Sequence, residues 1–366
     1  MFVVVTRNFP PEVGGMQSLV GGLSESLVNH GPVKVFTFEH SNSETYDSKS
    51  NMDISRIKGF KIFRKYRKAN LVNDFLNNSS NIRAVFADHW KSLEILNNEY
   101  LKKTRTICLI HSKEINHDIN SSQNKRIINS MQKADFVIAN SNFTKDLAIK
   151  IGIDSSKLKV IFPGIKKPKI INEQYKIEAD NFFKESFPKI ITVARLEKRK
   201  GHDKILMAIK NLKSKFSKIK YISIGTGEEE EKLKKLAQEL QIKNEVVFLK
   251  NIDENLKFSL VASSNLFLMP TRIVKKSVEG FGISYMEAAS YSVGSIGGKD
   301  GGASDAIIHN KTGLICDGND LNSIYESIIN FFNNKNYINF GNSAKEYSEE
   351  FHWNKIVKSY LKLIND

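Results

Sequence analysis

Two cations follow an apolar, strand-like run near the middle of the chain. Arg195 comes directly after Ile190–Ala194, and Lys200 follows five residues later. A guanidinium can fork onto two phosphate oxygens, whereas an ammonium acts as a point charge. The pattern indicates a phosphate-binding edge, but a solvated basic turn explains Lys198–Lys200 equally well.

Two carboxylates, Glu279 and Glu287, bracket a glycine-rich loop and the start of an expected helix near Ser284. A glycosidase needs two carboxyl groups about 5–10 Å apart across one bond. Eight helical residues would separate these two by about 12 Å, which argues against an acid and nucleophile pair. Ser284-x-x-Glu287 also fits a capping box, so a binding role and a capping role compete evenly for Glu287.

Glycines and a histidine follow other expected strands. The segment Pro10–Gly15 lies between the first strand and a helix, where backbone N–H groups can approach an anion. It is neither G-x-G-x-x-G nor a P-loop, and a simple tight turn is equally compatible. His111 ends the run Thr106–His111, although a lone histidine is more often structural.

Metal-dependent catalysis has no support in this sequence. There is no Asp-x-Asp, and the eight histidines show no metal-ligand spacing. We therefore expect no metal ion and no other cofactor.

The elements that must position these residues alternate between short apolar runs and amphipathic, helix-length segments. This alternation predicts parallel sheets covered on both faces, and a Pro- and Gly-containing linker at Phe162–Pro168 predicts two doubly wound halves. The helices expected are Ser18–Asn29, Asp203–Ser214, Glu228–Leu240 and Leu321–Phe332. The strands expected are Phe2–Thr6, Val33–Phe38, Lys61–Phe63, Ala84–Ala87, Thr106–His111, Phe136–Ala139, Val160–Phe162, Ile190–Ala194, Tyr221–Gly225, Val246–Leu249, Leu266–Met269, Gly294–Gly297 and Gly313–Cys316.

Length and composition fit this organisation. The 366 residues exceed one ordinary domain of about 100–200 residues, and 40% hydrophobic with 26% charged residues excludes a disordered or fibrous chain. No apolar run approaches the roughly 20 residues of a membrane-spanning helix, and Met1–Thr6 is expected to be a strand and not a signal peptide. The two cysteines, far apart in apolar runs, favour a cytoplasmic location.

The charge is concentrated in the first half of the chain. The formal net charge is +15, and residues 1–170 hold 26 basic and 15 acidic side chains. Such asymmetry suggests an anionic partner, namely nucleic acid, an anionic membrane surface or a phosphorylated ligand. A solvated basic surface is the alternative explanation.

Taken in order, these segments resemble the family 4 retaining glycosyltransferases of GT-B fold, the glycosyl transferases group 1. The resemblance covers nearly the whole chain, and the order and spacing of its motifs are more specific than any one of them. Glu279 to Glu287 fits the family's Glu-x7-Glu pattern with its inner Gly-Phe-Gly, and Ala194 stands where a glycine is usual. The other matching segments are Pro10–Gly15, His30–Val35, His111, Ala134–Ser141, Phe162–Ile165, Ala194–Leu196 with Lys200-Gly201, Gly225–Gly227, Met269–Thr271, Gly301-Gly302, Gly313-Leu314 and Phe351–Trp353.

The resemblance implies an α/β fold of two Rossmann-like domains facing each other across a cleft. Residues 1–168 would bind the acceptor, residues 169–351 would bind the nucleotide sugar, and a helix over about 352–366 would pack back on the first domain. Family analogy gives His111, Arg195, Lys200 and Glu279 catalytic roles and assigns donor contacts to Gly15, Gly225, Gly227, Gly280, Phe281, Gly282, Ile283 and Glu287. The donor would be a UDP-glucose type or GDP-mannose type sugar, with the UDP-sugar slightly preferred.

The acceptor is predicted from a basic segment, Arg56–Lys68, which holds seven basic residues in thirteen and no acid. Aromatic residues recur in it every three positions, as on an interfacial helix, although a strand through Phe60–Phe63 and a solvated turn fit equally well. We expect Arg64, Lys65, Arg67 and Lys68 to contact an anionic membrane, and the enzyme to glycosylate a lipid at its inner face. The alternatives are a soluble or polyprenyl-linked glycan acceptor, a sugar-nucleotide epimerase, and a nucleic-acid-binding protein. Against the last, no recognised nucleic-acid-binding module is present.

Overall fold

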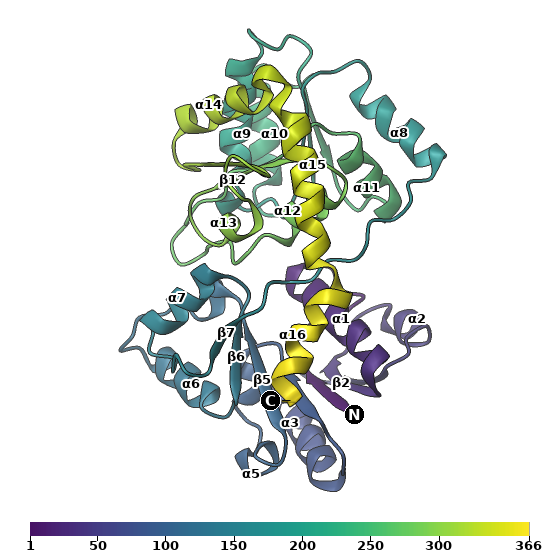
Figure 1. Ribbon diagram of the computed structural model, residues 1–366, viewed down its shortest axis with the longest axis vertical. Helices are drawn as coiled ribbons and strands as arrows, with labels where there is room; N and C mark the ends of the chain where they lie inside the picture. Colours follow the sequence, from purple (N-terminus) through teal and green to yellow (C-terminus); the bar gives the residue numbers. More distant parts are fainter. Residues whose placement is uncertain (366) are drawn as a thin grey trace. The chain divides into compact units, whose positions relative to one another are not determined.

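The chain forms two compact units, each described here by itself. The computed structural model describes residues 1–365 (Figure 1). Unit 1 comprises Met1–Lys166 together with the chain from Phe351 onward, and unit 2 comprises Lys167–Glu350. The fold class expected from the sequence, two doubly wound α/β units, is confirmed.

Unit 1 is built on a parallel sheet of seven strands within the described residues. Their order is β3-β2-β1-β4-β5-β6-β7, so the direction in which strands are added reverses between β1 and β4. Val4 of β1 lies opposite Val35 of β2 on one side and Phe86 of β4 on the other. The strands are β1 (Phe2–Val5), β2 (Val33–Phe38), β3 (Asp53–Ile57), β4 (Ala84–Ala87), β5 (Arg105–Ile110), β6 (Phe136–Ala139) and β7 (Leu158–Val160).

The helices of unit 1 include the last helix of the chain. Helix α16 lies against α1, and the Trp353 ring fits so closely that a Cβ at Gly22 or Gly164 would lie 2.1 or 2.4 Å from it. Trp353 therefore anchors the end of the chain in unit 1. The helices are α1 (Gly15–Leu27), α2 (Ser43–Asp47), α3 (Lys61–Asn78), α4 (Trp90–Leu93), α5 (Asn98–Leu101), α6 (Ser122–Met131), α7 (Asn142–Lys150) and α16 (Trp353–Asn365).

Unit 2 repeats the plan with six parallel strands in its described residues. The order is β10-β9-β8-β11-β12-β13, with the reversal between β8 and β11. The strands are β8 (Lys189–Val193), β9 (Lys220–Ile224), β10 (Val246–Leu249), β11 (Leu266–Met269), β12 (Ser295–Gly298) and β13 (Gly313–Cys316). The helices are α8 (Glu173–Phe183), α9 (His202–Leu212), α10 (Glu230–Glu239), α11 (Glu254–Ala262), α12 (Ile283–Ser290), α13 (Ala303–Ala306), α14 (Leu321–Phe332) and α15 (Asn336–Ser348).

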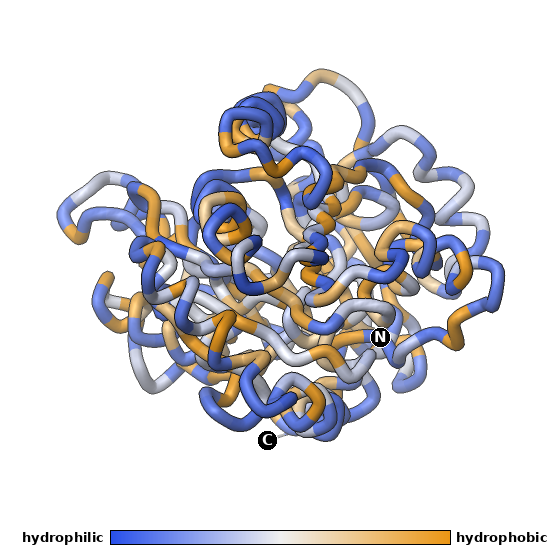
Figure 2. Tube along the Cα trace, turned by 90° about the horizontal axis from the view of Figure 1, so that it is seen from above, coloured by the Kyte–Doolittle hydropathy of each residue, from blue (hydrophilic) through white to orange (hydrophobic). Residues whose placement is uncertain are grey.

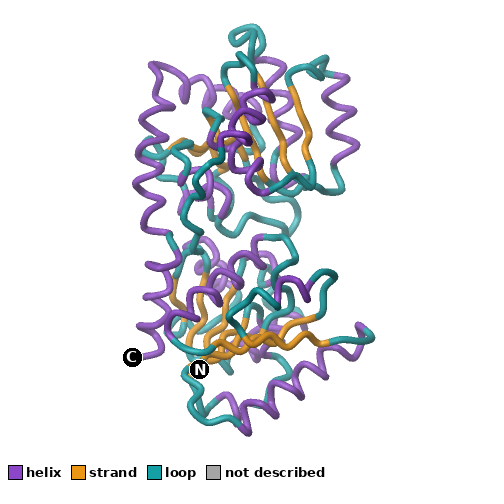
Figure 3. The backbone as a smooth tube through the Cα atoms, turned by 90° about the vertical axis from the view of Figure 1, so that its right-hand side faces the viewer, coloured by secondary structure: helices purple, strands orange, loops and turns teal. Residues whose placement is uncertain are grey.

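Both sheets are buried on their two faces. Strands such as β1, β4 and β11 are apolar at every position and fully buried. Figure 3 shows helices on either side of the strands in each unit. Continuous apolar strands are what such two-sided burial requires.

One expected strand is wrong. Lys61–Phe63 forms the first turn of helix α3, because its apolar residues continue at helical spacing into the buried Ala69, Val72 and Leu76. The real strand of this region, β3, lies at the sheet edge and buries only Ile57. The expected strand Val160–Phe162 is displaced by two residues from β7.

Hydrophobic residues occur in short runs along the trace in Figure 2, separated by hydrophilic ones. Among residues 1–365, no helix combines the length and the apolar character that spanning a membrane requires.

Candidate functional site

The candidate site of unit 2 lies where the strand order reverses. Arg195 follows β8, and the loop that carries Glu279 follows β11, its neighbour in the sheet. Ligands of open α/β sheets bind beyond the carboxyl ends of strands at this kind of position. The topology thus brings together two segments that are 84 residues apart in sequence.

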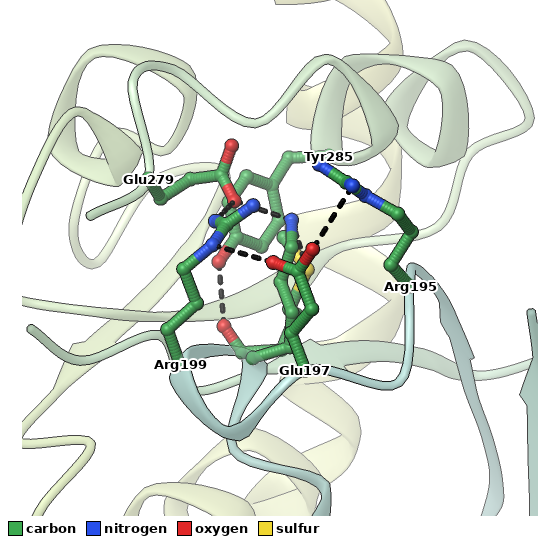
Figure 4. Close-up of polar contacts among 7 residues, drawn as sticks. Arg195, Glu197, Arg199, Glu279 and Tyr285 are labelled. Carbon is green, nitrogen blue, oxygen red and sulfur yellow. Dashed lines mark hydrogen bonds and ion pairs between the residues drawn. The ribbon is translucent and has the colours of Figure 1, made fainter. Parts of the chain in front are cut away.

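Three charged side chains form the centre of this site (Figure 4). Arg199 Nη1 donates to Glu279 Oε2 at 2.7 Å, and Lys200 Nζ donates to the same oxygen. The side chains of Arg199, Lys200 and Glu279 are only 11, 10 and 13% exposed. Because buried charges are tolerated only when paired, each of these groups depends on the others.

The pairing sets the protonation of Glu279. Burial alone would raise the pKa of this carboxyl, but the Lys200 and Arg199 cations outweigh it and lower the pKa to about 2. Burial lowers the pKa of Lys200, and Glu279 partly offsets that effect. Glu279 is therefore an anion at neutral pH, held in place by two cations.

Arg195 differs from Lys200 in exposure. Its side chain is 69% exposed and its Nη1 lies 3.0 Å from Glu197 Oε1. Glu197 Oε2 accepts from Arg199 Nε at 2.9 Å, so Glu197 bridges the exposed arginine and the buried cluster. Arg195 can turn toward a ligand at the surface, whereas Lys200 cannot move without breaking the cluster.

Glu287 has no capping role. Helix α12 begins at Ile283 after Gly282, which has a left-handed φ of 89° and caps the helix without a side chain. Ser284 therefore lies inside the helix, and of the two alternatives left open for Glu287 the capping box is wrong. The Glu287 carboxyl is half-buried, and burial raises its pKa while Lys257 opposes the rise.

The glycines expected to contact a donor have packing reasons to be glycine. A Cβ at Gly225 would lie 2.0 Å from the Ala194 carbonyl oxygen, and one at Gly227 would lie 2.4 Å from that of Leu196. They allow the loop after β9 to support the loop that carries Arg195. In the Gly280–Ile283 segment, Phe281 is buried and a Cβ at Gly282 would lie 2.5 Å from the Tyr285 ring.

In unit 1, His111 directly follows β5 and is buried. Its Nε2 lies 3.0 Å from the Asp88 carbonyl oxygen, which can only accept, so Nε2 carries the proton. The His111 backbone N–H donates to Glu114, and burial raises the pKa of that carboxyl to about 8. Burial lowers the pKa of His111.

Sequence reasoning missed the polar residues beside the reversal between β1 and β4. Asp88 Oδ2 accepts from Thr6 Oγ1 at 2.7 Å and from the Arg7 backbone N–H at 3.0 Å. Arg7 Nη1 lies 3.4 Å from His89 Nε2. The available signal was that Asp88-His89 directly follows an apolar strand, as His111 does. Gly15 begins α1, and a Cβ there would meet no atom within 4 Å.

The predicted membrane residues do not share one face of α3. Arg64, Lys65 and Lys68 line a cavity of unit 1, whereas Arg67 does not line it and its Nη2 donates to the Phe60 carbonyl oxygen at 3.4 Å. Among residues 1–365, no group of three or more histidine, cysteine or acidic side chains is arranged to hold a metal ion.

Two family models match the chain. The model described as glycosyltransferase family 4 matches residues 13–167, and the model described as glycosyl transferases group 1 matches residues 173–350. The matched ranges follow the two units, and together they span most of the sequence.

Relatives named as mannosyltransferases match over most of their length. The chain is 24% identical over 344 residues to the GDP-mannose-dependent alpha-(1-6)-phosphatidylinositol monomannoside mannosyltransferase of Mycolicibacterium smegmatis, covering 89% of this chain and 87% of the relative. The protein of the same name from Mycobacterium tuberculosis H37Rv is 24% identical over 353 residues, with the same coverage.

Solved structures share the fold. Anabaena HepE in complex with UDP superposes with a TM-score of 0.82 at 15% identity, over 100% of this chain and 99% of HepE. A glycosyltransferase from Rickettsia africae superposes with a TM-score of 0.79 at 16% identity, over 99% of this chain and 97% of that one. With the family models and the named relatives, this fold shows that the chain is a nucleotide-sugar glycosyltransferase of GT-B type and belongs to family 4, the glycosyl transferases group 1.

Proposed function

We propose that the protein transfers a hexose from a nucleotide diphosphate sugar to a membrane lipid, with retention at the anomeric carbon and without a metal ion. The observation that carries this proposal is the cluster of Arg195, Arg199, Lys200 and Glu279 at the strand-order reversal of unit 2. It supplies positive charge where a metal-dependent enzyme would hold a divalent cation.

The cations would act on the leaving group. As the bond between the anomeric carbon and the phosphate oxygen breaks, negative charge grows on the diphosphate, and Arg195 and Lys200 would stabilise it. The acceptor hydroxyl oxygen would form the new bond on the same face of the sugar. Its proton would pass to the departing phosphate oxygen, so that the products are the glycoside and the nucleoside diphosphate.

Glu279 would position the sugar. Both cations contact its Oε2, so Oε1 can accept a hydrogen bond from a sugar hydroxyl. The lowered pKa keeps the carboxyl ionised at neutral pH, which suits an acceptor of hydroxyl protons. Backbone N–H groups around Phe281–Ile283 would meet the sugar and phosphate, and Glu287 would bind the ribose.

Unit 1 would contribute His111 and Gly15. His111 would approach the donor sugar, and Gly15 would allow the backbone to come close to the reacting atoms. The open space around a Gly15 Cβ is compatible with this role. Replacement of His111 by Ala should lower transfer more than it weakens donor binding.

The donor is proposed to be GDP-mannose, ahead of the UDP-sugar that we favoured from the sequence. The relatives that match over most of the chain are named as GDP-mannose-dependent. The α linkage in their names matches the α linkage of GDP-mannose itself, as retention requires. The UDP-bound structure is only 15% identical to this chain and shares the fold alone. Its bound UDP is therefore weaker support for a UDP-sugar donor than the names of the relatives are for GDP-mannose.

The acceptor is proposed to be a lipid. The same relatives are named for a phosphatidylinositol monomannoside acceptor. In this chain, the first turns of α3 expose apolar side chains, with Ile62 76% and Phe63 60% exposed. Such side chains beside lysines and arginines suit contact with an anionic bilayer.

Donor binding is tested first by thermal shift against GDP-mannose, UDP-glucose, UDP-galactose and free nucleotides, with and without EDTA. GDP-mannose should raise the melting temperature in both buffers, and Arg195→Ala should reduce the shift. Lys198→Ala is the matched control, because Lys198 is exposed in the same basic turn and outside the cluster. No shift with any nucleotide sugar would refute the donor assignment.

Acceptor class is tested with the donor so identified. Radiolabelled hexose should enter the organic phase when phosphatidylinositol-containing vesicles are supplied. Transfer to soluble or polyprenyl-linked glycans in place of the phospholipid would refute the lipid acceptor and leave the transferase intact.

A further inference from the structure

Unit 1 contains a cavity of about 510 Å³ beneath the first turns of α3. Its wall comes from the segment after β1, the end of β2, helices α3 and α4, the segment that follows α4, and one residue of α6. A volume of this size is in the usual range for small-molecule sites. The cavity is unusual in its charge, because seven basic side chains line it. Arg126 is neutralised by Glu94. The other six are Arg7, Lys61, Arg64, Lys65, Lys68 and Lys91.

Acidic residues do not balance this charge. Glu94 is the single acid among the described lining residues, and both its oxygens are held by Arg126, at 2.6 and 3.0 Å. Across residues 1–365, no salt bridge involves Lys61, Arg64 or Lys65. Among the described residues, the remaining six cations therefore line the cavity without a salt bridge.

The contacts of the deeper cations leave capacity for a ligand. Arg64 Nε is buried and has no hydrogen-bond partner among the described residues, while its guanidinium stacks 4.9 Å from the Phe38 ring centroid. Lys68 is buried, donates to the Thr6 carbonyl oxygen at 2.6 Å and lies over the same ring. A buried hydrogen-bond donor without a partner is costly. A hydrogen-bond acceptor on a ligand in the cavity would therefore satisfy Arg64 Nε.

Burial and mutual repulsion both disfavour the charged forms of two lining lysines. Burial lowers the pKa of Lys68 to about 8, with Arg7 adding to the shift and Asp88 opposing it. Burial, Arg7 and Arg126 all lower the pKa of Lys91, against Glu94. These cations repel one another, and a multiply charged anion among them would relieve the repulsion.

The rest of the wall limits the size and polarity of the ligand. Asn8 and Ser92 offer hydrogen bonds, and Phe38, Ile95 and Leu96 form an apolar side. A bare inorganic ion would leave this apolar side unused. A phosphate ester that carries a small polyol or glyceryl group would use both.

We propose that this cavity binds the phosphate group of a phosphate ester, held by Arg64 with Lys61, Lys65, Lys68 and Lys91. The inference rests on the proposed function only in naming that ester as the headgroup of the acceptor. The cavity itself is inferred from its own residues, and its phosphate could also come from a water-soluble ester.

The first experiment measures binding of glycerol 3-phosphate to the full-length protein by calorimetry, with glycerol as the uncharged control. Saturable binding is expected for the ester alone. Loss of one charge-assisted hydrogen bond in Arg64→Gln should weaken it about tenfold to a hundredfold. Arg67→Gln removes the same charge from the same helix outside the cavity and should change affinity less than twofold. Lys65→Gln, at an exposed position, provides a second cavity variant should Arg64→Gln fail to fold.

Vesicle flotation then distinguishes the source of the phosphate. Attraction to the surface charge alone would make Arg64→Gln and Arg67→Gln lose binding to phosphatidylglycerol vesicles equally. A headgroup in the cavity would make the loss much larger for Arg64→Gln. Ester binding without this difference would assign the cavity to a soluble phosphate ester. No saturable ester binding, or equal effects of both variants on it, would overturn the proposal.

Failure of this inference and failure of the proposed function are separable. Donor binding is measured with nucleotide sugars and Arg195→Ala in unit 2, whereas the cavity is measured with glycerol 3-phosphate in unit 1. If the protein binds the ester but no nucleotide sugar, the proposal for the cavity stands and the proposed donor is refuted.

Discussion

Replacing Glu279 by Gln tests the charge cluster of unit 2. The pKa of Glu279 is lowered to about 2 from an ordinary value of 4.5 because Lys200 and Arg199 overcome the opposing effect of burial. A carboxyl whose pKa is lower in the folded than in the unfolded state stabilises the fold at pH values above its unfolded pKa. That stabilisation is lost as the pH falls toward the folded value. The difference between these two pKa values corresponds to roughly 3 kcal/mol.

Only part of this stabilisation is lost in an accessible pH range. Applying the linkage relation to these two pKa values, the wild type should lose about 1.4 kcal/mol through Glu279 between pH 6 and pH 3.5. Glu279→Gln has no carboxyl to protonate at this position. Between the same two pH values, its free energy of unfolding should therefore fall by about 1.4 kcal/mol less than that of the wild type. At neutral pH the variant should be less stable by about 3 kcal/mol, since Lys200 and Arg199 stay buried without their anion.

The assay can separate the two units. Both tryptophans, Trp90 and Trp353, lie in unit 1, so tryptophan fluorescence follows that unit alone. Far-UV circular dichroism follows both units in the same urea titration. The substitution should shift the dichroism transition and leave the fluorescence transition in place. An unchanged pH dependence in Glu279→Gln would refute the ion-pair account of this carboxyl.

Three further outcomes follow from the placement of the site residues. Arg195→Ala should leave the melting temperature unchanged and lower the transfer rate about 100-fold. Lys200→Ala should lower both the melting temperature and the transfer rate, because Glu279 loses a buried partner. Thermal melting and a transfer assay on the same preparations check these outcomes. Gly225→Ala should destabilise unit 2 by about 1–3 kcal/mol through its clash with Ala194, and Gly15→Ala should leave the urea midpoint unchanged. Glu287→Gln should raise the melting temperature, since a carboxyl whose pKa is raised by burial is a cost at neutral pH, and it should weaken nucleotide binding in the same titration.

Several strands that are continuous apolar runs were located from the sequence with their exact bounds. Ala84–Ala87, Phe136–Ala139 and Leu266–Met269 are continuous apolar runs, and the structure has strands with these same bounds. The edge strand Asp53–Ile57 was missed because its sequence carries Asp53, Ser55 and Arg56. These polar residues interrupt any apolar run, so the sequence pattern did not mark this segment as a strand.

The candidate site was predictable only in part. Arg195, Lys200 and Glu279 stand out because each follows a strand or lies in a glycine loop. The roles of Glu197 and Arg199 were hidden, because a Lys-Arg-Lys turn looks like solvated surface in the sequence. Arg199 is buried by a loop that arrives from β11, and this contact spans 80 residues. Pairings of this kind depend on sheet order, which local patterns do not contain.

Helix α12 shows how a local signal can mislead. Ser284-x-x-Glu287 has the spacing of a capping box, but the left-handed conformation of Gly282 starts the helix one residue before Ser284. A serine inside the first turn cannot accept the capping hydrogen bond from the residue three positions on. The glycine pattern, and not the serine, determined where the helix begins.

The two basic regions differ in how their charge is compensated, and this difference bears on salt dependence. In unit 2, Glu197 and Glu279 already neutralise much of the charge of the three cations, so a diphosphate must compete with these carboxylates for Arg195. In unit 1, Glu94 is the only carboxylate among the described residues that line the cavity, and Arg126 holds it. Ester binding there replaces only water and counterions, so its affinity should fall steeply with salt. Donor affinity should fall less, because salt also weakens the internal ion pairs that oppose it.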